Sequence, residues 1–224
     1  MNGSRTEEFM QYLSALDADA IAHLEQPDDL TARILDATRE QAMEVGFRRI
    51  TMDDVARRSG LGRATLYRRF PNKAALIDAL VLTEARRYLA GDAEAWARGT
   101  TLEDRMFRST MFGVTFLRDN ELLHKLMRTE PDALLRSLTV DAGPILDFAA
   151  EQTVTLLRTA LHGDSHISAA QQRHLRTVAE LQTRLTLSFI VTPHTSIELT
   201  TPAEVRAYVR QYLLPMITTP PARG

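Results

Sequence analysis

The chain contains 224 residues, of which 44% are hydrophobic and 25% are charged, a globular composition sufficient for one sizeable domain and a small module. It contains no cysteine, which excludes disulfides, thiolate metal sites and cysteine nucleophiles. No cationic segment precedes an apolar run at the N-terminus, and no stretch reaches the roughly 18 uncharged apolar residues that a membrane span needs. We therefore expect a soluble, cytoplasmic protein with no membrane partner.

The net charge of −2 conceals two segments of opposite sign. Between residues 46 and 75 there are eight arginines and lysines against two aspartates, whereas the first 29 residues contain seven acidic residues against one arginine. A local excess of cations is typical of a phosphate-binding surface. We expect residues 1–28 to form an acidic extension that is either disordered or helical; a helical extension would pack on the basic segment and compete with phosphate there.

The periodicity of the apolar residues predicts an all-α fold. They recur at three- and four-residue spacing, and sustained two-residue alternation is hard to find. The first clear helix is expected to begin near Asp29, with Asp28 or Asp29 as its cap, and to end at Gly46. The later helices, beyond the two short ones described next, are expected near residues 72–96, 101–119, 121–128, 132–139, 144–161, 168–191 and 202–217.

Two short helices are predicted between the first helix and the long helix that starts near residue 72. Thr51 and Asp54 have the spacing of a capping box at a helix start, and Gly60-Leu61-Gly62 breaks that helix after about two turns. The second short helix begins at Arg63 and stops before Pro71, because proline disfavours helical geometry at the residue that precedes it.

These two helices have the pattern of a helix-turn-helix, in which the second helix presents an outer face that can enter the major groove of DNA. Apolar residues are spaced to pack the two helices on each other and on the first helix; they are Val55, Ala56, Leu61, Leu66 and Phe70. Other side chains of the second helix are left outward; they are Arg63, Ala64, Thr65, Tyr67 and Arg68. We expect the outward set to contact DNA.

Contacts to phosphate position a protein on DNA, and contacts to bases read the sequence. Phosphate is the expected partner of a hydroxyl at a helix start, a phenol and an ammonium group, which belong to Thr51, Tyr67 and Lys73. Bases are the expected partners of two guanidinium groups, a hydroxyl and a small side chain, which belong to Arg63, Arg68, Thr65 and Ala64. The hydroxyl of Thr65 also suits a phosphate.

The run Thr65-Leu66-Tyr67-Arg68-Arg69-Phe70-Pro71-Asn72-Lys73 resembles the T-L-Y-x-x-F-x-x-K pattern of the TetR family of repressors, including the preceding threonine-started helix and glycine turn. The resemblance covers roughly residues 30 to 80, and the remainder agrees with the family in helix number and length. It implies a DNA-binding domain over residues 29–75 and a helical effector-binding and dimerisation domain over residues 76–224. It also implies DNA contact by all the residues just assigned to phosphate or bases.

In this family a repressor is released from a palindromic operator by a small ligand, and two long helices near the C-terminus form a two-fold dimer. The sequence has two amphipathic helices there, with candidate interface residues at Leu181, Leu185, Phe189, Tyr208 and Tyr212. The alternative is that these apolar stripes face only the core of their own domain.

An apolar effector pocket is the expected role of the aromatic and methionine residues in the middle helices. The candidate lining residues are Trp96, Phe112, Phe116, His124, Met127 and Phe148, where methionine suits a bulky hydrophobic ligand and His124 offers a polar group. The alternative is that these residues are ordinary core and that the regulator has no small-molecule effector.

Metal and enzyme chemistry are weaker alternatives. His162, Asp164, His166 and His174 lie in or near an interhelix loop that gives them no fixed common face, so no metal site and no cofactor are expected. The chain has no G-x-S-x-G, H-E-x-x-H, phosphate-cradling glycine loop or dinucleotide fingerprint. A helical enzyme is therefore a distant alternative to a DNA-binding regulator.

Overall fold

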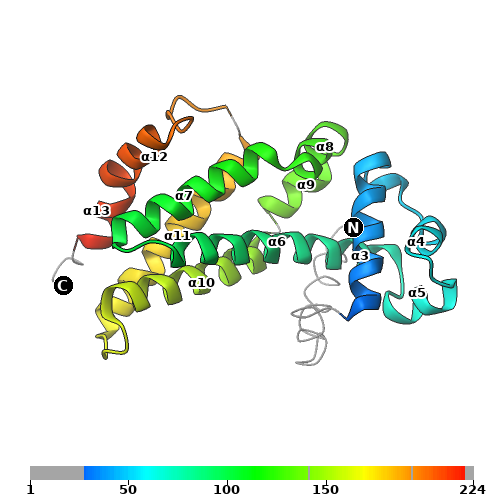
Figure 1. The fold of residues 1–224 in the computed structure, drawn as a ribbon, viewed down its shortest axis with the longest axis horizontal. Helices are drawn as coiled ribbons and strands as arrows, with labels where there is room; N and C mark the ends of the chain where they lie inside the picture. The colour runs from blue at the N-terminus through cyan, green and yellow to red at the C-terminus, as the bar shows by residue number, and fades with distance from the viewer. Residues whose placement is uncertain (1–27, 141, 193, 220–224) are drawn as a thin grey trace. The chain divides into compact units, whose positions relative to one another are not determined.

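The computed structural model describes residues 28–140, 142–192 and 194–219, and it shows helices joined by turns, without a strand among these residues (Figure 1). This confirms the expected all-α class. The predicted acidic extension lies, apart from Asp28, outside the described residues. Within the described part, no helix is both long and apolar enough to span a membrane.

The observed helices follow the predicted ones to within a few residues. They are α3 (Asp29–Val45), the 3₁₀ turn η1 (Phe47–Arg49), α4 (Met52–Ser59), α5 (Arg63–Arg69), α6 (Lys73–Ala97), α7 (Leu102–Asp119), α8 (Glu121–Thr129), α9 (Pro131–Leu138), α10 (Gly143–His162), α11 (Ala169–Val191), α12 (Pro202–Tyr208), the π turn η2 (Val209–Leu213) and α13 (Leu214–Thr218).

The predicted last helix, over residues 202–217, contains a π turn that the periodicity did not reveal. This turn, η2, joins α12 to α13 immediately before Pro215. Proline has no N–H to donate to the carbonyl one turn earlier, and its ring crowds that carbonyl. A wider turn at this point is a recognised way for a helix to accommodate such a disruption.

The described chain forms two compact units. The first contains α3, η1, α4, α5 and α6 up to Arg86, together with residues 120–134, which carry α8 and the start of α9. The second contains the rest of α6, α7 and everything after residue 134. The compact unit around the helix-turn-helix therefore includes a segment from later in the chain.

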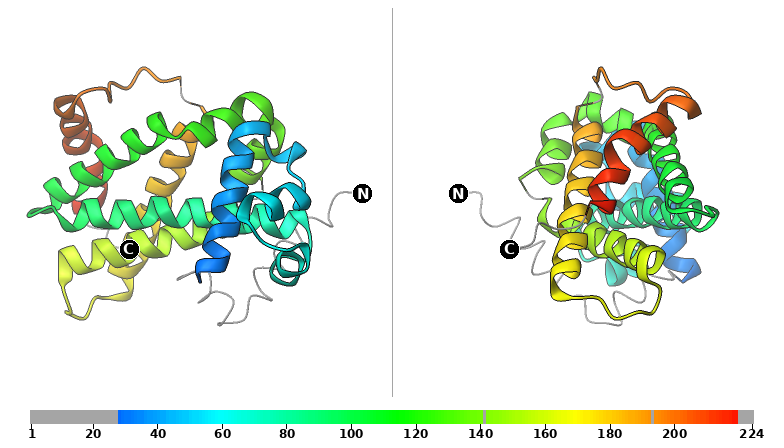
Figure 2. Two further views of the ribbon diagram at one scale, coloured as in Figure 1. Left: turned by 45° about the vertical axis from the view of Figure 1, so that its right-hand side comes forward. Right: turned by 90° about the vertical axis from the view of Figure 1, so that its left-hand side faces the viewer.

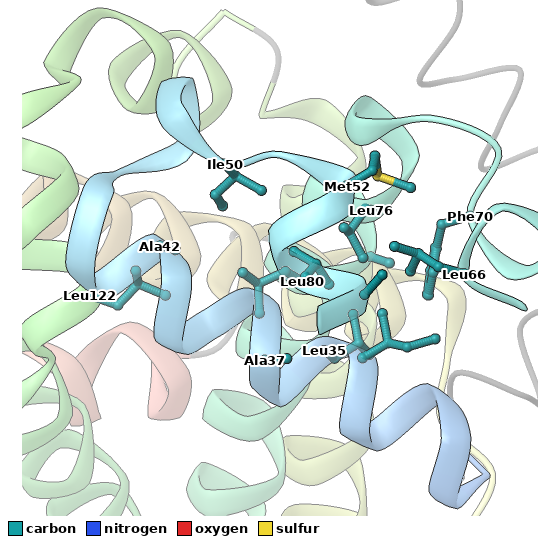
Figure 3. Close-up of a cluster of buried hydrophobic side chains, with 14 of the residues drawn as sticks. Leu35, Ala37, Ala42, Ile50, Met52, Leu66, Phe70, Leu76, Leu80 and Leu122 are labelled. Carbon is teal, nitrogen blue, oxygen red and sulfur yellow. The ribbon is translucent and has the colours of Figure 1, made fainter. Parts of the chain in front are cut away.

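The core of the first unit is an apolar cluster with residues from α3, α4, α5, α6 and α8 (Figure 3). Ile34 of α3, Leu66 of α5 and Leu76 of α6 are completely buried in it, and Leu122 of α8 is nearly so. Full burial of one such side chain contributes about 1.5–3 kcal/mol. The expected packing of the two short helices on the first helix is confirmed, because Val55, Ala56, Leu66 and Phe70 are buried and Leu61 packs against them.

The core of the second unit lies where α10 and α11 pack together as an antiparallel pair joined by a short connection (Figure 2). Trp96, Leu157 and Leu175 are buried in this core with residues of the C-terminal segment. That segment is also held by polar contacts: the Arg206 guanidinium lies 3.9 Å from the centre of the Phe107 ring. Arg206 thus holds the start of the segment, and Ile217 is buried in the core near its end.

A second cluster in this unit combines aromatic rings with a half-buried carboxyl group. Tyr88 of α6 lies 5.6 Å from Phe112 and 5.1 Å from Phe116 between ring centroids. Asp92, one turn along α6, accepts a hydrogen bond of 2.5 Å from the Ser109 hydroxyl. Burial raises the pKa of Asp92 above its ordinary value, and the Ser109 hydroxyl opposes this effect. Burial also raises the pKa of Tyr88.

Replacing Asp92 by asparagine should stabilise the protein at neutral pH. A carboxyl group whose pKa is raised by folding costs stability once the pH exceeds its unfolded pKa of 3.8, and this cost is absent below that pH. Asparagine keeps an oxygen for the Ser109 hydroxyl and has no charge to bury. We expect Asp92→Asn to have a higher free energy of unfolding than the wild type in urea at about pH 7–8, with the difference shrinking towards about pH 4.

The exposed Asp147→Asn serves as the control, and it should change the free energy of unfolding by less than about 0.5 kcal/mol at each pH. A difference between Asp92→Asn and the wild type that grows as the pH falls would contradict the role assigned to burial.

Candidate nucleic-acid interface

The helix-turn-helix is formed by α4 and α5 and by the turn between them, and local capping explains both helix boundaries. The Thr51 hydroxyl accepts a hydrogen bond of 3.1 Å from the Asp54 N–H at the start of α4. Gly60 ends α4 with φ 68° and ψ 26°, a left-handed conformation that is costly for residues with a Cβ atom. The turn then continues through Gly62, which is the N-cap of α5.

The outer face of α5 carries the side chains that the sequence analysis expects to contact DNA. Arg63, Ala64, Tyr67 and Arg68 are exposed, and Thr65 is half-buried. Tyr67 retains 47% of its accessible surface although it is a large aromatic residue. The structure therefore presents these five residues together on one short helix, opposite the buried Leu66 and Phe70.

Several cations of the basic segment pair with acids inside the same unit. Arg63 pairs with Asp53 across the turn between α4 and α5. Arg58 pairs with Glu44 of α3 at 2.6 Å and with Glu40 at 3.4 Å. Ion pairs at exposed positions contribute little to stability, so these side chains remain available to exchange one anionic partner for another.

Thr51 is more constrained than its sequence pattern suggests. Its hydroxyl donates to the Asp54 carboxylate at 2.5 Å while accepting from the Asp54 N–H. This hydrogen bond, followed by those from Arg57, lowers the pKa of Asp54. The carboxylate thus meets the hydroxyl and not the backbone N–H of a full capping box. A phosphate that accepts a hydrogen bond from the Thr51 hydroxyl must displace the Asp54 carboxylate from it.

Lys73 also has a partner within the unit. Its ammonium donates a hydrogen bond of 2.7 Å to the carbonyl of Arg48, in the turn before α4. An ammonium group has three donors, so this bond leaves donors for a phosphate. Lys73, the expected phosphate contact at the start of α6, therefore lies against η1, the turn that leads into α4.

Sequence reasoning did not assign a role to Arg48 and Arg49, although both belong to the basic segment. They lie in the 3₁₀ turn η1 and are exposed. Within the described part of the chain, the guanidinium groups of Arg48, Arg49 and Arg68 form no ion pair, unlike that of Arg69, which pairs with Asp28. Arg48 and Arg49 become candidate DNA contacts because they are exposed in the turn just before Thr51, the N-cap of α4. Their exposure depends on the geometry of this turn.

The residues expected to line an effector site belong to different clusters and to both compact units. Phe112 and Phe116 lie together in the aromatic cluster with Tyr88. Trp96 is buried in the separate core formed with α10 and α11.

The other three candidates lie elsewhere. His124 is exposed and Met127 is half-buried on α8, which belongs to the first unit. Phe148 on α10 retains 42% exposure. Sequence reasoning missed Asp92, whose half-buried carboxyl adjoins the aromatic cluster, because a single acidic residue on a long helix gives no sign of burial.

The candidate dimer residues differ in exposure. On α11, Leu181 is 45% and Leu185 40% exposed, and Phe189 is half-buried. In the C-terminal segment Tyr212 is exposed and Tyr208 is half-buried, with their ring centroids 5.7 Å apart. Isolated apolar side chains are common on surfaces, but two large ones on adjacent turns of one helix form a patch.

The histidines considered as metal ligands are not brought together with other ligands. In the described ranges, no three histidine, aspartate or glutamate residues form a group that could hold a metal ion. His174 has another partner, since its Nε2 atom lies 3.3 Å from the carbonyl oxygen of Ile217.

Two family models match the chain. Residues 34–80 match the model of bacterial regulatory proteins of the tetR family, and residues 112–211 match the C-terminal domain of the bacterial tetracycline repressor. The first match contains the whole helix-turn-helix, and the second lies in the helices that follow α6. No curated protein matches the chain.

Solved structures share the fold. The TetR family repressor AlkX from Dietzia sp. has 23% sequence identity and a TM-score of 0.64, with 84% of this chain and 97% of that chain covered. GusR from Salmonella enterica has 22% identity and a TM-score of 0.52, with coverage of 84% and 97%. The repressor QsdR of R. erythropolis has 19% identity and a TM-score of 0.52, with coverage of 80% and 92%.

Proposed function

Because the chain belongs to the TetR family of bacterial regulatory proteins, we propose that this DNA-binding transcriptional regulator is a repressor, which binds a palindromic operator as a homodimer and leaves it when a small, hydrophobic effector binds. The observation that supports operator reading most directly is the exposed face of α5, where Arg63, Tyr67 and Arg68 stand beside one another on a helix that is otherwise packed against α3 and α4.

The proposed reading of DNA divides the work between α5 and the turns around it. Arg68 is exposed and unpaired with any described acid, so its fork of donors can meet a guanine without breaking an internal ion pair. Arg63 must exchange Asp53 for a base. Thr51, Tyr67 and Lys73 are proposed to hold phosphates on either side, and Thr65 and Ala64 to meet base edges.

The proposed dimer interface is a surface of α10 and α11. Phe148, Leu181 and Leu185 expose apolar surface on these two packed helices, and a second copy applied by two-fold symmetry would cover the same surface on both partners. Phe189 extends the patch along α11. Tyr208 lies in the C-terminal segment and is half-covered within its own unit, which makes it a secondary contact.

The proposed effector site is the aromatic cluster of Tyr88, Phe112 and Phe116 with Asp92 beside it. These rings offer apolar contact, and the Asp92 carboxyl, whose pKa is raised by burial, can donate a hydrogen bond in its protonated form. Such a setting suits an apolar molecule that carries one hydroxyl or carbonyl group.

Arg68→Ala should relax base preference, whereas Lys73→Ala should weaken binding to all DNA sequences. Loss of one bidentate contact to guanine costs about 1–3 kcal/mol of discrimination, and loss of one phosphate contact lowers the slope of log affinity against log salt by about 1. Footprinting on the DNA upstream of the gene defines the operator, and titrations on operator and random DNA at several salt concentrations measure both effects. Equal losses on operator and random DNA for Arg68→Ala would contradict its role as a reader.

Leu181→Glu combined with Leu185→Glu should convert the dimer into a monomer, because the interface would have to bury two unpaired charges in each copy. Sedimentation velocity at micromolar concentration is the measurement. Arg173→Glu, at an exposed position of the same helix, changes the charge outside the patch and should leave the protein dimeric. A dimer that persists in the double variant places the interface elsewhere.

1-Decanol should raise the melting temperature by at least about 2–4 °C when present well above its dissociation constant, and it should reduce operator binding. Decane, which has the same chain without the hydroxyl, tests whether the Asp92 carboxyl contributes, and we expect it to have the smaller effect. A lack of response to these and other lipophilic compounds would favour the alternative of a regulator without a small-molecule effector.

A further inference from the structure

Glu130 is unusual because it is charged and buried. It follows α8 as its C-cap and retains only 5% of its accessible surface. Within the described part of the chain, it is the one charged residue in the buried core and forms no ion pair. A buried carboxylate is costly unless hydrogen bonds replace its hydration, so its partner indicates what it does.

The partner of Glu130 is the backbone of the turn that precedes α4. Its Oε1 atom accepts a hydrogen bond of 2.9 Å from the N–H of Arg48, across 82 positions of sequence. Gly46 provides the space: a Cβ atom on this residue would lie 2.4 Å from the same oxygen, and its φ of 77° favours glycine in any case. The turn is thus shaped to receive the carboxylate.

The same residue of the turn is held from a second side. The carbonyl of Arg48 accepts a hydrogen bond of 2.7 Å from the ammonium of Lys73, at the start of α6. The backbone N–H and the carbonyl of Arg48 are therefore both hydrogen-bonded to charged side chains, one at the end of α8 and one at the start of α6. We call Glu130, Arg48 and Lys73 the turn clamp.

The turn clamp lies directly before the DNA-reading elements. Arg48 is three residues from Thr51, which caps α4, and both η1 arginines extend from the turn into solvent. The position of the turn sets the start of α4 and, through the packing of α4 on α5, the direction of the reading face. α8 enters this unit from a segment flanked on both sides by chain of the other unit, so a displacement of α8 would pull on the turn.

We propose that Glu130 is a positioning residue for operator binding, which acts through the Arg48 N–H to hold the start of α4 in the orientation that fits DNA. The proposal rests on operator binding by the helix-turn-helix. Loss of the Glu130 acceptor leaves the turn free to adopt other positions, and DNA must then order it at a cost in affinity. Loss of Lys73 differs, because this side chain is also proposed to bind a phosphate, which every DNA sequence offers. The effect is greatest on the operator, where α5 must reach base edges, and smaller on random DNA, where mobile phosphate contacts suffice.

The test compares three substitutions of Glu130 in the full chain. Glu130→Gln keeps an oxygen at the same reach and removes the charge, Glu130→Asp keeps the charge and shortens the reach, and Glu130→Ala removes the acceptor. Glu121→Ala, at an exposed acidic position on the same helix, is the control. Affinities for operator and random DNA and the hydrogen-exchange rate of the Arg48 amide are measured for each protein.

We expect Glu130→Gln and Glu121→Ala to bind operator within about threefold of the wild type, and Glu130→Asp and Glu130→Ala to bind it about tenfold more weakly, a change of 1.4 kcal/mol. Random DNA should be affected less than threefold, and the Arg48 amide should exchange faster in the two weakened variants. If Glu130→Ala does not fold, Glu130→Asp carries the test.

Operator affinity within threefold of the wild type in Glu130→Asp, or equal losses on operator and random DNA, would overturn the proposal. An Arg48 amide that exchanges as slowly in Glu130→Asp as in the wild type would also overturn the proposal. It would show that this amide stays protected without the carboxylate at the reach of glutamate. Failure of the wild type itself to bind any upstream DNA would instead contradict the proposed function, and the exchange measurement would still report on the clamp.

Discussion

The recognition helix α5 depends on the burial of Leu66 and Phe70 under the rest of the first unit. It has seven residues, and an isolated helix of that length is not stable in water. Its start is capped only by the backbone of Gly62, since no side chain bonds to its first amides. Tertiary packing therefore holds α5, and the packed side determines which residues face outward.

Charge in the first unit follows from this arrangement. A helix that must bind phosphate carries arginines that repel one another when no DNA is present. Asp53 and Asp28 pair with two arginines of α5, and Glu44 pairs with Arg58 of α4. These pairs are exposed, so their contribution to stability is small. Each acid also sets the position of its arginine side chain in the absence of DNA. Arg68 lacks such a partner among the described residues and is the side chain most directly available to a base.

The two units use buried polar groups differently. In the first, Glu130 accepts a hydrogen bond from the Arg48 amide, in the turn next to the helix-turn-helix. In the second, Asp92 accepts a hydrogen bond from the Ser109 hydroxyl and lies beside the ring of Tyr88. A carboxyl group with a shifted pKa near a cluster of aromatic rings is typical of sites that bind a ligand, whereas one that accepts a hydrogen bond from a backbone amide helps to hold a single conformation.

Local sequence signals predicted most of the fold and the outward face of α5, because caps, glycine turns, Pro71 and three- to four-residue periodicity each act within a few residues. The same signals predicted which side of α4 and α5 is buried. They gave no information on the π turn before Pro215, on the hydrogen bond from the Thr51 hydroxyl to the Asp54 carboxylate, or on the division of the candidate effector residues between two units. Those features depend on which neighbour each side chain meets.

By itself, then, the sequence determined an all-α chain with a basic helix-turn-helix and the family to which it belongs, since these rest on short-range patterns of apolar, capping and cationic residues. Only the tertiary structure decided that α8 belongs with the helix-turn-helix, that Glu130 accepts a hydrogen bond from the turn before α4, and that Asp92 lies half-buried beside aromatic rings. Contacts across 82 positions leave no periodic trace in the sequence, because nothing local distinguishes an acid that will be buried from one that will remain in water.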